Sequence, residues 1–145
     1  MNAVVQEERT GCAIASVAAL AGITYSRAKA GAAELGIAAA DPALWHETDH
    51  VRTLLATFGL RAGPKEQPFR SWEQLPNQAL LAIKWHFEKT GPAWHWVVFV
   101  REGTDAYVLD PKKSLRTNRR TDFGRMQPKW FIAIERGARP KKAAT

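Results

Sequence analysis

Apolar residues recur at helical spacing through the first half of the chain. From Cys12 to about Leu35 the sequence is dense in alanine, with larger apolar residues three and four positions apart. Gly22 interrupts this run, so the pattern predicts two helices joined by a turn, with Ser26 as the N-cap of the second helix. We therefore expect the chain to begin with a pair of short, alanine-rich helices.

A third helix is predicted after the Asp41-Pro42 dipeptide. Its apolar face carries four residues at helical spacing, namely Val51, Leu54, Leu55 and Phe58. Gly59 is expected to follow the end of this helix, because glycine readily adopts the left-handed conformation that closes many helices.

The second half of the chain has the pattern of β-strands. Apolar, β-branched and aromatic runs predict four strands, over residues 79–85, 94–101, 106–109 and 130–135. Short turns between consecutive strands favour an antiparallel sheet, and helices grouped before strands favour an α+β fold with the helices on one face. The segment 63–76 carries three prolines, and we expect it to be a loop on the surface.

Composition is that of one ordinary globular domain. Hydrophobic residues make up 46% of the 145 residues and charged residues 24%, which excludes disordered, collagen-like and coiled-coil classes. The single cysteine cannot form an intrachain disulfide, and Glu7 and Glu8 stand where a signal peptide has basic residues. We expect a protein of the cytoplasm that does not enter a membrane.

The net charge of +7 is unevenly distributed. Residues 1–110 hold 10 basic and 12 acidic residues, whereas residues 111–145 hold 11 basic and 2 acidic ones. We expect one domain over residues 1–136 and a basic, flexible tail over residues 137–145. Such a segment attracts a polyanion, nucleic acid included, or an acidic protein partner, and a solvated tail without a partner is the alternative.

Cys12 is the first candidate for chemistry because it opens an apolar helix. Unpaired backbone N–H groups and the helix dipole at that position favour an anion, and therefore favour the thiolate that acts as a nucleophile. A lone cysteine can equally be a small buried hydrophobic residue.

His95 and Asp110 are the next candidates. His95 lies within the predicted strand 94–101, where an imidazole needs hydrogen-bond partners. A hairpin centred on Gly103-Thr104 pairs positions whose numbers sum to about 207, which sets Asp110 near Val97 and close to His95. A carboxylate there orients the imidazole, whereas the alternative is an Asp-Pro turn with no chemical role.

Gln6 completes the pattern, because a side-chain amide just upstream of a nucleophile can donate a hydrogen bond to an oxyanion. Gln6 and Cys12, then His95-Trp96-Val97-Val98, then Val108-Leu109-Asp110-Pro111, resemble the papain-like cysteine peptidases of the double-glycine-leader, bacteriocin-processing type. The resemblance implies a papain-like α+β fold in which N-terminal helices pack on a mainly antiparallel sheet. It also implies cysteine as nucleophile, histidine as general base, aspartate as its orienter and glutamine as oxyanion donor.

Two features separate this chain from that family. The family usually has Asp-Cys-Gly, whereas this chain has Gly11-Cys12-Ala13, and no membrane-spanning or ATP-binding exporter domains follow. We therefore expect a stand-alone relative and do not carry over cleavage of double-glycine leaders.

The sequence His46-Glu47-Thr48-Asp49-His50 also matches the H-E-x-x-H pattern of zinc peptidases. Asp49 stands where that pattern usually has an uncharged residue, and a third ligand is lacking. We expect no metal and no other cofactor, and interpret these residues as the exposed face of the third helix.

The sequence predicts a cysteine peptidase or related thiol-dependent amide hydrolase with Cys12, His95, Asp110 and Gln6 in its site and a peptide or protein as substrate. The alternative is an inactive papain-like scaffold, a binding module that engages nucleic acid or an acidic partner through its basic C-terminal segment.

Overall fold

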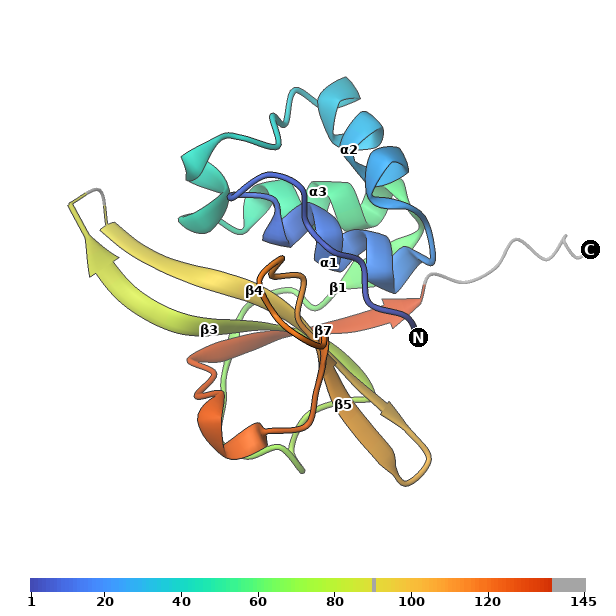
Figure 1. The fold of residues 1–145 in the computed structure, drawn as a ribbon, viewed down its shortest axis with the longest axis vertical. Coiled ribbons are helices and arrows are strands. Elements are labelled where there is room, and N and C mark those ends of the chain that lie inside the picture. Colours follow the sequence, from blue (N-terminus) through green and yellow to red (C-terminus); the bar gives the residue numbers. More distant parts are fainter. Residues whose placement is uncertain (90, 137–145) are drawn as a thin grey trace, which may run out of the picture.

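The computed structural model describes residues 1–89 and 91–136, and the expectations for the basic segment 137–145 lie outside this range. Three helices form one layer on a seven-stranded sheet in which every pairing is antiparallel (Figure 1). This arrangement confirms the α+β class with helices on one face.

The helices differ from the predicted ones at their ends. Helices α1 (Cys12–Ala21) and α2 (Tyr25–Glu34) are separated at Gly22, as predicted. The expected N-cap Ser26 is wrong: Thr24 caps α2, and its side-chain oxygen accepts a hydrogen bond of 3.1 Å from the Arg27 backbone N–H.

The predicted third helix is interrupted. The 3₁₀ helix η1 (Pro42–Trp45) comes first, capped by the Asp41 side chain, and α3 (Asp49–Thr57) begins only after residues 46–48. Gly59 adopts a φ of 79° just past the end of α3, in the left-handed region expected of it.

The sheet contains the four predicted strands and three short ones that the pattern did not indicate. The strands run in the order β1-β7-β3-β4-β5-β6, and β2 pairs with β7. Their bounds are β1 (Leu60–Ala62), β2 (Gln67–Pro68), β3 (Gln78–Glu88), β4 (Gly91–Glu102), β5 (Asp105–Leu109), β6 (Arg119–Arg120) and β7 (Trp130–Arg136). A second 3₁₀ helix, η2 (Phe123–Arg125), precedes β7.

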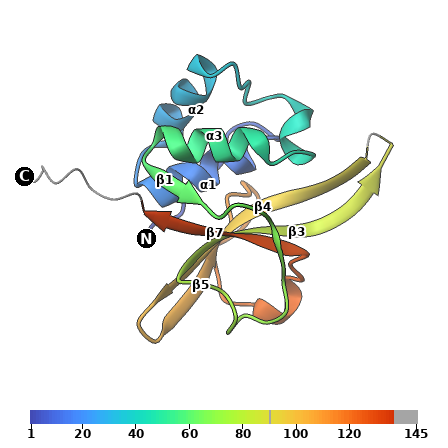
Figure 2. The ribbon, with the colours of Figure 1, turned by 180° about the vertical axis from the view of Figure 1, so that it is seen from behind.

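Apolar residues are buried on both faces of the sheet. On one face, α1 packs against β4 with nine of its ten residues buried, and the rings of Trp94, Trp96 and Trp130 meet edge to face. On the other face, Phe69, Trp72 and Leu75 pack against the sheet. The segment 63–76 is therefore not merely a surface loop, since it covers the second face of the sheet (Figure 2).

Two details of strand pairing position the site. Val98 pairs with Leu109 in the β4–β5 hairpin, which is the register expected from the Gly103 turn. Asp110, the residue after β5, therefore lies beside the middle of β4. In the β3–β4 pair the register shifts between Ile83 and His86, and this β-bulge holds Lys84 at a φ of 55°.

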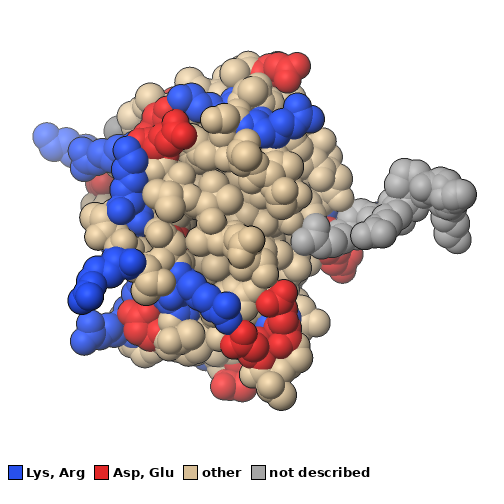
Figure 3. Space-filling model, turned by 45° about the vertical axis from the view of Figure 1, so that its right-hand side comes forward, with Lys and Arg blue, Asp and Glu red and all other residues tan. Residues whose placement is uncertain are grey.

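Charged side chains of both signs lie mainly around the rim of the face shown in Figure 3, whose centre is mostly uncharged. None of the helices that the structure describes has the length and apolar character of a membrane span.

Candidate active site

Cys12 is the first residue of α1, in the layer of helices above the sheet. Gly11 precedes the helix and offers no side-chain cap, so the first N–H groups of α1 lack the acceptor that a capping side chain supplies. The exposed fraction of Cys12 is 0%. The positive end of a helix dipole favours negative charge close to it.

His95 lies on β4, and its side chain is 14% exposed. Its Nε2–H donates a hydrogen bond of 2.7 Å to Oδ1 of Asp110. Nε2 is occupied in this way, and the Cys12 side chain also interacts with the His95 ring and raises its pKa. The structure thus brings together a thiol, an imidazole and a carboxylate from positions 12, 95 and 110.

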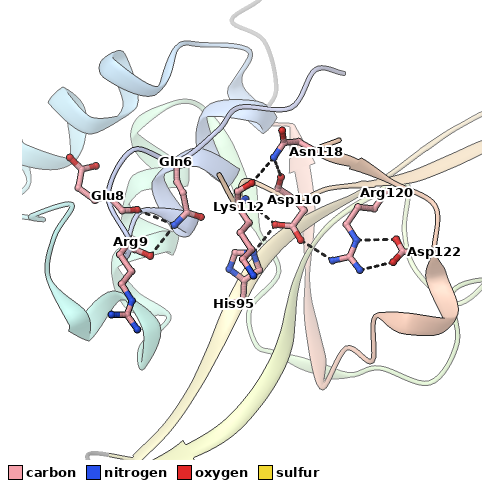
Figure 4. A network of polar contacts seen from close by, with 9 residues as sticks. All are labelled: Gln6, Glu8, Arg9, His95, Asp110, Lys112, Asn118, Arg120 and Asp122. Atoms are coloured by element: carbon pink, nitrogen blue, oxygen red, sulfur yellow. Dashed lines mark hydrogen bonds and ion pairs between the residues drawn. The ribbon is translucent and has the colours of Figure 1, made fainter. Parts of the chain in front are cut away.

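Asp110 is 1% exposed, and its charge is neutralised by more than His95. Arg120 of β6 donates from Nη1 to Asp110 Oδ2 at 2.9 Å, and the Lys112 backbone N–H donates to Oδ1 at 3.0 Å (Figure 4). Arg120 is held in turn by the Asp122 carboxylate through Nε at 2.9 Å and Nη2 at 2.7 Å.

The loop after Asp110 is fixed by Asn118. The Asn118 Nδ2 amide donates to the carbonyls of Asp110 and Lys112 at 2.7 and 2.9 Å, while the Asp110 N–H donates to the Asn118 carbonyl at 2.8 Å (Figure 4). Sequence reasoning missed both Asn118 and Arg120. The only available signal was the Arg119-Arg120 pair, a dipeptide too short to indicate a strand.

The pKa values of His95 and Asp110 are displaced in opposite directions. Burial alone lowers the pKa of His95, but hydrogen bonds to Asp110 and Cys12, together with their negative charges, outweigh it and raise that pKa to about 9. Burial alone raises the pKa of Asp110, but His95, the Lys112 N–H and Arg120 lower it to about 2. At neutral pH the resting pair is therefore an imidazolium and a carboxylate.

Gln6 lies next to this pair, in the segment before α1. Its backbone N–H donates to the Pro111 carbonyl at 2.9 Å, which joins the N-terminal segment to the loop after Asp110. Its Nε2 amide donates to the carbonyls of Glu8 and Arg9 at 3.0 and 2.9 Å, and its buried Oε1 has no partner among the described residues. Both N–H groups of the amide are thus engaged in this structure.

A cleft of about 640 Å³ opens beside His95 and Gln6. Its lining residues come from the N-terminal segment, from η1, from β3 and β4, and from the loop after Asp110, and they include Glu7, Glu8, Arg9, Trp45, Lys84, His86, Glu88, Lys112 and Lys113. Cys12 is fully buried and is not among the lining residues.

The H-E-x-x-H residues do not share a helical face. His46 follows η1 and directs Nε2 toward Glu88 at 3.6 Å, whereas His50 lies in α3. Burial lowers the pKa of His50 to about 4, and its ring nitrogens have no hydrogen-bond partner among the described residues. Within residues 1–89 and 91–136 there is no group of three His, Cys, Asp or Glu side chains that could hold a metal ion.

Comparison with known proteins adds a structural likeness. No family model matches the chain, and no curated protein matches it. The crystal structure of a double glycine motif protease from an AMS/PCAT transporter, in complex with its leader peptide, superposes with a TM-score of 0.59 at 17% sequence identity. The match covers 93% of this chain and 91% of that one, so the two share a papain-like peptidase fold.

Gly11→Ala is expected to lower the free energy of unfolding by about 1–3 kcal/mol. The reason is that a Cβ added at Gly11 overlaps the Tyr25 hydroxyl oxygen. Chemical denaturation measures this cost, with Gly124→Ala as control, since a Cβ added at Gly124 meets no neighbour. The cost should shrink in a Tyr25→Phe background, and an equal cost in both backgrounds contradicts the overlap.

Proposed function

We propose that the protein is a cysteine peptidase or related thiol-dependent amide hydrolase, with Cys12 as nucleophile, His95 as proton carrier and Asp110 as the group that orients His95. One observation carries this proposal: the His95 ring is hydrogen-bonded to Asp110 through Nε2 and also interacts with the Cys12 side chain. A shared fold with a double glycine motif protease supports it.

In the proposed reaction the Cys12 thiolate attacks the carbonyl carbon of an amide, and a C–S bond forms as the carbonyl oxygen becomes an oxyanion. His95, protonated at rest, gives its proton to the leaving nitrogen as the C–N bond breaks and a thioester remains. His95, now neutral, takes a proton from water as that water attacks the thioester. Breakage of the C–S bond releases the carboxylic acid and restores the Cys12 thiolate beside protonated His95.

Gln6, together with the Cys12 backbone N–H, is proposed to donate to the oxyanion. Because both amide N–H groups of Gln6 are bonded to carbonyls at rest, one of these bonds must be exchanged for the oxyanion. Access to Cys12 also requires movement, since Cys12 is fully buried and does not line the cleft. We infer that the segment 6–9 moves when substrate enters.

Thiol reactivity tests the nucleophile without a known substrate. Cys12 is expected to react with iodoacetamide at a pH well below that required by a free cysteine, because imidazolium at position 95 stabilises the thiolate. The measurement is the alkylation rate against pH, followed by mass spectrometry on wild type and His95→Ala. Identical pH midpoints in both proteins, at the value of a free cysteine, contradict the paired nucleophile.

The His95 imidazolium is expected to be lost as pH rises through about 9. The pKa of His95 is raised above its ordinary value of 6.5. The stability that the His95–Asp110 ion pair contributes to the fold is therefore fully present below pH 6.5 and is lost as the pH rises toward 9. In Asp110→Asn, loss of the carboxylate should lower the His95 pKa, which an NMR titration of the ring reports.

The matched control is Asp122→Asn, which removes another carboxylate bound to Arg120 but none bound to His95. A His95 titration unchanged in folded Asp110→Asn, or equally displaced in both variants, contradicts the orienting role of Asp110.

Gln6→Ala is expected to lower peptide hydrolysis by about 10²–10³-fold, the size of one lost oxyanion donor. Its rate of alkylation by iodoacetamide should not fall, because alkylation develops no oxyanion and the lost bonds only loosen the segment 6–9. Hydrolysis is measured on a peptide mixture by mass spectrometry. If both rates fall together, Gln6 acts by holding the segment 6–9 in place rather than by donating to the oxyanion.

A further inference from the structure

Lysine side chains form the wall of the cleft next to His95. Lys112 and Lys113 follow Asp110-Pro111 in the loop that Asn118 fixes. Lys84 reaches the same wall from β3, where it follows Ile83, the residue paired with His95. We call Lys84 and Lys112 the lysine pair.

The lysine pair has no carboxylate partner among the described residues. No ion pair joins either ammonium group to an acidic side chain of residues 1–89 and 91–136. Burial, together with the positive charge of Lys112, lowers the pKa of Lys84. Asp110, the nearby carboxylate, is already bonded to His95 and Arg120.

Two of the three acidic residues that line the cleft are bonded to other groups, and the third, Glu7, lies in the N-terminal segment. Glu8 is bonded to Tyr25 and Lys29 of α2. Glu88, at the end of β3, lies between two imidazoles, 2.9 Å from His86 Nε2 and 3.6 Å from His46 Nε2. Unpaired positive charge therefore remains at the His95 end of the cleft.

The backbone fixes where Lys84 sits. The β-bulge between Ile83 and His86 holds Lys84 in a left-handed conformation that residues other than glycine rarely adopt. Bulges redirect single side chains, and they are common beside active sites. Lys84 also lines a second cavity of about 450 Å³, whose other cations are Arg125, Lys129 and Arg120, the last already paired with Asp110 and Asp122.

We propose that the lysine pair binds a carboxylate of the substrate, on the leaving side of the bond that is cut. This inference rests on the peptidase function proposed above. The leaving side follows because His95 donates its proton to the leaving nitrogen, so that part of the substrate passes along the wall beside His95. An anion there is bonded by two ammonium groups that lack acidic partners.

Two sources supply such a carboxylate in a peptide. One is the side chain of an aspartate or glutamate that follows the scissile bond, and the other is the free carboxyl group at the end of a short peptide. Both present the same anionic chemistry to the lysine pair, and the second experiment below separates them.

The first experiment compares alkylation of Cys12 by iodoacetate, an anion, with alkylation by iodoacetamide, its neutral analogue. The ratio of the two rates is expected to fall about threefold in Lys84→Gln and in Lys112→Gln, the effect of one unit charge about 6 Å away in water. Lys65→Gln, which makes the same charge change away from the cleft, should leave the ratio unchanged.

Each outcome decides one of the two proposals. A ratio unchanged in both Lys84→Gln and Lys112→Gln, with iodoacetamide rates as in wild type, overturns the carboxylate subsite and leaves the peptidase proposal standing. A wild type whose Cys12 is not alkylated by iodoacetamide and which hydrolyses none of the peptides offered overturns the peptidase proposal, and the subsite with it. If Lys84→Gln disturbs the β-bulge, the ratio measured in Lys112→Gln still decides the outcome, because Lys112 lies outside the bulge.

The second experiment identifies the source of the carboxylate. A mixture of random peptides is offered to the wild type with free C-termini and, separately, with amidated C-termini, and the products are sequenced by mass spectrometry. Cleavage before aspartate or glutamate in both mixtures identifies a side-chain carboxylate. Cleavage near the end of the free-acid peptides alone identifies the terminal carboxylate, and cleavage indifferent to both contradicts the subsite.

Discussion

A buried negative charge on Asp110 is the constraint around which the site is built. A carboxylate that is 1% exposed is stable only when cations and N–H groups surround it. The sheet supplies them from two neighbours, His95 on β4 and Arg120 on β6, while the loop after Asp110 contributes the Lys112 N–H. The same bonds that allow Asp110 to be buried also hold the His95 ring in a single orientation.

The helical layer contributes the remaining partner. Because α1 is made of small residues, it lies close to β4 with nearly every side chain buried, and its first residue reaches the imidazole. Tyr25 of α2 presses against Gly11 and bonds to Glu8, so the start of α1 and the segment before it are held by the second helix. Side-chain size at Gly11 is thereby linked to the position of the sulfur.

Much of this arrangement could be predicted from the sequence. The long strands and the first two helices have clear periodicity, and the Gly103 turn sets the register that brings Asp110 toward His95. The two- and three-residue strands are too short to have a period, so the position of Arg120 was not predictable. The bulge that places Lys84 depends on a register shift between strands, which no local pattern records.

The position of β7 has a consequence for how the protein is made. This strand is the last along the described chain, yet it lies between β1 and β3 inside the sheet. During synthesis, the cysteine and the histidine leave the ribosome well before the strand that closes the sheet beneath them. A nascent chain thus exposes these two residues before the sheet that positions them is complete.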